Sequence, residues 1–105
     1  MKHIIQSVGD LGLVIRAVRK SRGVRQDDLA SIVKVSKQFA VDVERGKPTV
    51  QFDRVLLLLK ELGITLSIDF DDAALKKLEQ LQAQRQKKAS QVAAAAAADQ
   101  TEASS

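Results

Sequence analysis

Apolar residues recur three and four positions apart through most of the first 62 residues, which is the spacing of one buried helical face. The pattern predicts four short helices, at roughly 10–22, 26–33, 37–45 and 48–62. The residues expected to bound them are Asp10 and Ser36 as N-caps, Pro48 and Thr49 at the start of the fourth helix, and Gly23, Gly46 and Gly63 at C-termini. Helices this short are unstable alone, so their apolar faces must pack on one another.

After the fourth helix the pattern changes to a period of two. Residues 64–70 alternate apolar and polar positions, which is typical of a half-buried strand. A lone strand leaves backbone donors and acceptors unpaired, so we expect it to pair with the same strand of a second chain. Leu66, Ile68 and Phe70 would then form the dimer interface. The alternative is an extended linker.

The sequence pattern of the C-terminal third gives a weaker indication of regular secondary structure. Residues 71–89 form either a fifth helix that presents Leu75, Leu78 and Leu81 or a solvated extension. Residues 90–105 are rich in alanine and lack large apolar groups, so we expect a disordered tail there. With residues 1–9 as an N-terminal arm and 10–63 as the folded domain, the sequence predicts an all-α bundle of four to five helices and one short C-terminal strand.

Composition narrows the chemistry. The 105 residues suffice for one small domain, which gains stability most readily by forming a homodimer. The chain has no cysteine and a single histidine, His3, so neither a disulfide nor a metal or cofactor site is expected. It has no nucleophile–base pair, so we do not expect an enzyme. No signal peptide or membrane-length apolar run is visible, and the expected location is the cytoplasm.

The net charge of +4 permits a polyanionic partner without requiring one. Its distribution is more informative, because five basic residues without an acidic one fall within ten positions: Arg16, Arg19, Lys20, Arg22 and Arg25. Such a cluster is either a solvated face or a surface for a polyanion.

Residues 26–46 meet the physical requirements of a helix-turn-helix. Ala30 is small enough to stand where two helices cross, and Leu29, Val33, Val35 and Val43 anchor both helices. Ser36 caps the second helix and exposes its first turn. The motif therefore predicts binding to double-stranded DNA through the major groove.

Three side chains are candidates for base reading. Lys37 can contact guanine, Gln38 can grip adenine, and Val41 either touches a thymine methyl group or is simply buried. The expected phosphate contacts are Arg25, Gln26, Ser36, Arg45 and Lys47, with solvated surface charge as the alternative. Glu44 is expected to pair with a basic group, since phosphate would repel its carboxylate.

These residues resemble the Cro and phage-repressor (Xre) helix-turn-helix family over roughly residues 11–64. The similarity lies in the Gln26–Ala30 spacing, Val35-Ser36, Glu44-Arg45-Gly46 and the leucine-rich helix that follows. It implies a four- or five-helix DNA-binding domain.

The stretch from Val35 to Thr49 and the passage Leu-Gly-Ile-Thr-Leu-Ser-Ile are more narrowly similar to HipB-like antitoxins. That resemblance implies a strand paired across a dimer, repression of the protein's own operon and a partner toxin of the HipA serine/threonine-kinase type. A stand-alone repressor without a toxin is the alternative, and an interaction adaptor that has lost DNA binding is a third.

Two positions depart from the family pattern. Lys34 stands where the turn usually has glycine, and a left-handed conformation there costs roughly 1–2 kcal/mol. Ala40 replaces a larger aliphatic residue, and the neighbouring Phe39 could fill that volume. Both departures bear on the angle of the recognition helix.

Overall fold

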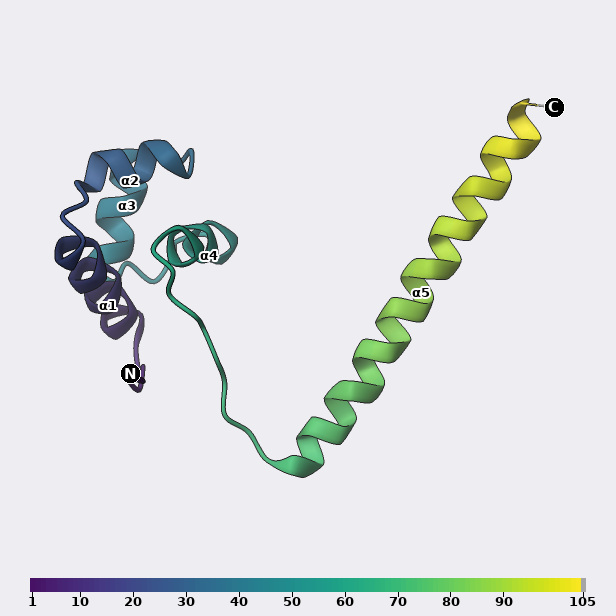
Figure 1. The fold of residues 1–105 in the computed structure, drawn as a ribbon, viewed down its shortest axis with the longest axis horizontal. Helices are drawn as coiled ribbons and strands as arrows, with labels where there is room; N and C mark the ends of the chain where they lie inside the picture. The colour runs from purple at the N-terminus through teal and green to yellow at the C-terminus, as the bar shows by residue number, and fades with distance from the viewer. Residues whose placement is uncertain (105) are drawn as a thin grey trace. The chain divides into compact units, whose positions relative to one another are not determined.

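The computed structural model describes the backbone of residues 1–104 and the side chains of residues 1–95. It contains five helices, which are α1 (Val8–Ser21), α2 (Gln26–Ile32), α3 (Lys37–Glu44), α4 (Phe52–Glu61) and α5 (Asp72–Ser104) (Figure 1). The chain divides into one unit of residues 1–67, which holds α1–α4, and a second that begins at Ile68 and holds α5. The predicted all-α class is therefore confirmed. Among the described residues, none of these helices has the length and apolarity to cross a bilayer.

The core of the first unit is built from all four of its helices. Its buried members are Ile15, Leu29, Val43, Val55, Leu58, Leu59 and Leu62. Fully burying an aliphatic side chain of this size contributes about 1.5–3 kcal/mol, so these seven supply the main driving force for folding. Helix α3 contacts both α1 and α2, and it is the central element of the motif.

The predicted caps are partly correct. Ser36 does cap α3, because its Oγ accepts a hydrogen bond from Phe39 N at 3.0 Å. Asp10 is not the N-cap of α1, which begins at Val8 and is capped by Ser7. The Ser7 Oγ accepts from Asp10 N at 3.1 Å, and Asp10 Oδ2 accepts from Gln6 N at 2.9 Å. This reciprocal arrangement resembles a capping box, which is why the helix begins earlier than expected.

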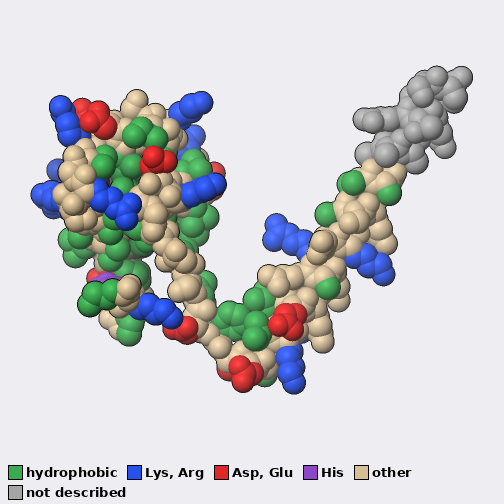
Figure 2. All heavy atoms as spheres, viewed as in Figure 1, with side chains coloured by type: hydrophobic (Ala, Val, Ile, Leu, Met, Phe, Trp, Pro, Cys, Tyr) green, Lys and Arg blue, Asp and Glu red, His purple; other side chains and the backbone are tan. Residues whose placement is uncertain are grey.

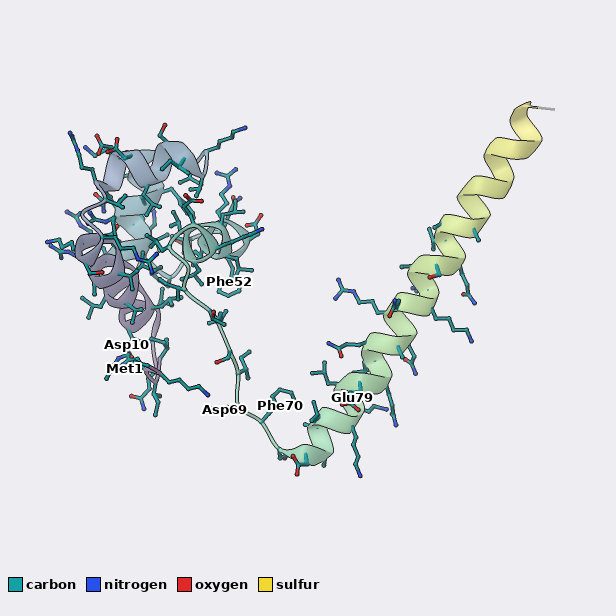
Figure 3. All side chains as sticks on the ribbon, in the orientation of Figure 1. Met1, Asp10, Phe52, Asp69, Phe70 and Glu79 are labelled. Atoms are coloured by element: carbon teal, nitrogen blue, oxygen red, sulfur yellow. The ribbon has the colours of Figure 1, made fainter. Side chains whose placement is uncertain are left out.

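The fourth helix also begins at a different residue from the predicted one. Pro48 and Thr49 lie in the loop before α4, which starts only at Phe52. Its first residue, Phe52, is labelled in Figure 3 and is more than half exposed. A proline at the first position of a helix is common but not obligatory, and here it stiffens the connection instead.

Two glycines allow α1 to lie directly against the C-terminal end of α3. A Cβ atom on Gly12 would lie 2.5 Å from the Val43 carbonyl oxygen and 2.7 Å from that of Glu44. A Cβ on Gly46, which has a φ of +80°, would lie 2.7 Å from Gly9 Cα. Because backbone atoms make these contacts, any larger residue would push the two helices apart.

Residues 64–70 form no strand in the single chain, and their predicted pairing with a second chain stays a prediction. The described residues offer no second strand with which this segment could pair, and an unpaired strand gains no ladder hydrogen bonds. Only its first residue is tied down, since Ile64 N donates to Leu59 O at 2.9 Å. Leu66, Ile68 and Phe70 are exposed, and Figure 3 marks Phe70 shortly before α5.

Helix α5 is much longer than the sequence pattern predicts. Asp71 Oδ1 accepts from Ala74 N at 2.7 Å and caps its start. The helix then continues to Ser104, through residues 90–104 where the sequence predicts a disordered tail. Alanine has the highest helix propensity of all residues, so the alanine run at 93–98 favours a helical backbone. Figure 2 shows apolar side chains near the beginning of α5, where Leu75, Leu78 and Leu81 are exposed.

Candidate nucleic-acid interface

The turn between α2 and α3 is closed without glycine. Val35 N donates to Ala30 O at 2.9 Å, and Ala30 itself is buried where the two helices meet. Lys34 adopts a φ of 61° and is the only non-glycine residue with positive φ in the described part of the chain. The turn thus keeps the left-handed geometry expected from the family pattern, and Lys34 bears its conformational cost.

The first turn of α3 presents two polar side chains to solvent. Lys37 and Gln38 directly follow the Ser36 cap, and both are exposed. Because Ser36 uses its hydroxyl oxygen as the cap, the hydroxyl proton remains free to donate to a ligand. The structure thus places both candidates for base reading on the exposed first turn of α3, as expected, and their role in base reading stays a prediction.

Asp42 orients the side chain of Gln38. The Gln38 Nε2 atom donates to Asp42 Oδ1 at 2.8 Å, one helical turn away. The other amide proton and the Oε1 atom of Gln38 stay free, and these form the donor–acceptor pair that adenine N7 and N6 require. Lys47 Nζ lies 3.5 Å from Asp42 Oδ2 and offsets its charge. The sequence analysis did not identify Asp42 as a partner of Gln38, although residues four positions apart on a helix are neighbours.

A buried ion pair fixes α3 against α1. Arg19 donates from Nε to Glu44 Oε2 and from Nη2 to Glu44 Oε1, both at 2.9 Å. Its Nη1 atom donates to Val24 O at 2.9 Å, just before α2. The side chains are 10% and 4% exposed. The predicted pairing of Glu44 with a basic group is confirmed. Through Arg19 it links α1, α3 and the loop that leads into α2.

The remaining predicted residues lie around α2 and α3. Val41 is half-buried and faces a hollow that it shares with Gln26 and Arg45. Arg25 is exposed, and its Nη2 atom lies 3.2 Å from Asp27 Oδ2. Leu66, Ile68 and Phe70, the predicted dimer contacts, belong to the extended segment and take no part in this surface.

The charges at the start of α2 act on Asp27. Desolvation tends to raise the pKa of this carboxyl group, but the Arg25 guanidinium, the backbone N–H groups of Asp27 and Asp28, and Lys37 together hold it below its ordinary value. Asp27 is therefore ionised at neutral pH and keeps Arg25 paired. No group of three or more potential metal ligands occurs among the described residues.

The comparisons with known proteins agree with this geometry. The family model described as Helix-turn-helix matches residues 15–68. The "Uncharacterized HTH-type transcriptional regulator y4mF" of Sinorhizobium fredii (strain NBRC 101917 / NGR234) is 44% identical over 68 residues, which are 65% of this chain and 90% of that protein.

Among solved structures, a chain of the "Structure of HipA-HipB-O2-O3 complex" superposes with a TM-score of 0.62. A chain of the "HipB-O4 20mer complex" does so with a TM-score of 0.61. Each is 17% identical, and each match covers 68% of this chain and 100% of the other. At that identity the likeness shows a shared fold.

Proposed function

We propose that this chain, which belongs to the helix-turn-helix family, is a sequence-specific DNA-binding transcriptional regulator. The observation that carries the proposal is the exposed first turn of α3, where Lys37 and Gln38 face solvent on a helix held by a buried ion pair. Such a turn is the part of a recognition helix that contacts base edges in the major groove.

In this proposal the side chains divide into two classes. Lys37 reads guanine, Gln38 reads adenine, and Val41, which lines the hollow, contacts a thymine methyl group. The backbone phosphates are bound by Arg25, Gln26, Ser36, Arg45 and Lys47. Phosphate contacts position the protein, whereas base contacts determine sequence preference.

The two classes are separable by experiment. A duplex selected from a random-sequence pool and a scrambled duplex are titrated over a salt series. Gln38→Ala should cost about 1–3 kcal/mol per half-site on the selected duplex and relax one base position. Arg45→Ala should weaken binding to both duplexes alike and lower the salt slope by about one. An unchanged ratio of selected to scrambled affinity in both Lys37→Ala and Gln38→Ala would contradict base reading by α3.

The proposed active form is a two-fold homodimer. Leu66, Ile68 and Phe70 expose large apolar surfaces at alternate positions of a segment whose backbone has no strand partner in the described residues. Pairing residues 64–70 with the same segment of a second chain would bury this apolar surface and give the backbone its hydrogen-bond partners. The two α3 helices would then read half-sites about 34 Å apart. Sedimentation should show a dimer at micromolar concentration, and Ile68→Asp should weaken both dimerisation and DNA affinity.

The finer proposal is an antitoxin that represses its own operon and neutralises a HipA-like serine/threonine-kinase toxin in the cytoplasm, with no enzymatic activity of its own. It is supported by the shared fold with chains from HipB structures. Co-expression with the product of a neighbouring kinase-like gene tests it directly. A stable complex and restored growth support the antitoxin, whereas operator binding without such a complex supports the alternative, a stand-alone repressor.

A further inference from the structure

A hollow of about 230 Å³ opens beside α3, between it and the first two helices. Its lining residues are Arg16 and Arg19 from α1, Gln26 from α2, and Val41, Glu44 and Arg45 from α3. Because a water molecule occupies about 30 Å³ in the liquid, the hollow has room for a small anionic group together with bridging water.

The hollow is lined by positively charged side chains that lack an ion-pair partner among the described residues. Both carboxylate oxygens of Glu44 already accept hydrogen bonds from Arg19, so these two residues neutralise each other. Arg16 and Arg45 are exposed, and neither forms an ion pair with any side chain described in the structure. Gln26 adds an amide donor. The lining thus presents the guanidinium groups of Arg16 and Arg45 and no unpaired carboxylate.

We propose that this hollow binds one backbone phosphate of the DNA and that Arg16, on α1, is a phosphate-binding residue of the interface. The proposal rests on the DNA-binding function above and adds a helix to the contact surface. A guanidinium can donate two parallel hydrogen bonds to a phosphate, which a surface lysine cannot do. Because Val41 shares the hollow, the bound phosphate lies next to the bases that α3 reads and fixes the register of that helix.

The test compares Arg16→Gln with the matched control Arg54→Gln, which removes an exposed arginine of α4 outside the hollow. Binding to the selected and the scrambled duplex is measured between about 50 and 200 mM salt, where affinity that depends on phosphate contacts falls steeply. Arg16→Gln should weaken binding to both duplexes about tenfold and lower the salt slope by about one. Arg54→Gln should leave the slope unchanged, and Arg16→Lys should restore the slope with only part of the affinity.

Each outcome is decisive. If the wild-type protein binds DNA and Arg16→Gln has the same slope and affinity as Arg54→Gln, the phosphate site is wrong while the proposed function stands. If the wild-type protein shows no salt-dependent DNA binding, the proposed function and the site fail together. Since Arg16 is exposed, equal melting temperatures of the wild type and the three variants would exclude unfolding as the cause of a loss.

Discussion

Replacing Glu44 by alanine should destabilise the α1–α4 unit more than most single substitutions would. The change removes the acceptor of two of the three hydrogen bonds that Arg19 makes. The guanidinium then stays in a site where its side chain is only 10% exposed, without an opposing charge. Breaking a buried ion pair from one side typically costs about 3–5 kcal/mol.

A loss of this size is large against the total stability of a small domain, which is about 5–15 kcal/mol. For a domain of this length each kcal/mol corresponds to a change in melting temperature of about 4–8 °C. The double variant Arg19→Met with Glu44→Leu removes both charges and keeps apolar volume. It should lose far less stability than Glu44→Ala, because no charge is left buried. Its remaining cost is the lost donor to Val24 O.

Scanning calorimetry is the suitable assay, since the chain has no tryptophan or tyrosine and the 33 residues of α5 would add a large background to a helical spectroscopic signal. The wild type, Glu44→Ala and the double variant are compared at the same concentration, because dimerisation would otherwise shift the transition. A loss below about 1 kcal/mol in Glu44→Ala would refute the reasoning, since that is the range of a solvent-exposed pair.

Three further predictions concern the turn, the helix crossing and the C-terminal helix. Lys34→Gly should stabilise the protein by about 0.5–1 kcal/mol in calorimetry, because glycine relieves the left-handed turn but costs unfolded-chain entropy. Gly12→Ala should destabilise it by about 1–3 kcal/mol, because its Cβ would meet Val43 O, whereas the Cβ of the control Gly9→Ala has room; equal effects would contradict this. Truncation before Ser90 should leave DNA affinity nearly unchanged in a titration, and a large loss would show that this part of α5 contributes.

The helical periodicity was sufficient to predict the number of core helices, because their short apolar faces have only one another to bury. The helix ends were harder to place. Asp10 and Ser7 are both good capping residues three positions apart, and only the hydrogen bond from Asp10 N to Ser7 Oγ shows that Ser7 is the cap. Residues 64–70 show the limit of a period-two pattern, since a strand also needs a partner that a single chain does not supply.

The candidate site was predictable where function depends on position along one helix, and not where it depends on packing between helices. The exposure of Lys37 and Gln38 follows from the Ser36 cap. The partner of Glu44 did not follow, because Arg19 lies 25 residues away and looked like one member of a surface cluster. Arg16 belonged to the same cluster, and only the folded chain shows that Arg19 is buried in the ion pair while Arg16 is exposed and lines the hollow.

The central position of α3 has a consequence for how such a regulator can change its target sequence. Its later residues Ala40, Val43 and Glu44 are buried and hold the domain together, while Lys37 and Gln38 are exposed in its first turn. If Lys37 and Gln38 read bases as proposed, substitutions at these two exposed positions should alter recognition with little penalty in folding. Sequence preference could then drift between related regulators, or be reassigned by design, while the buried part of the domain stays constant.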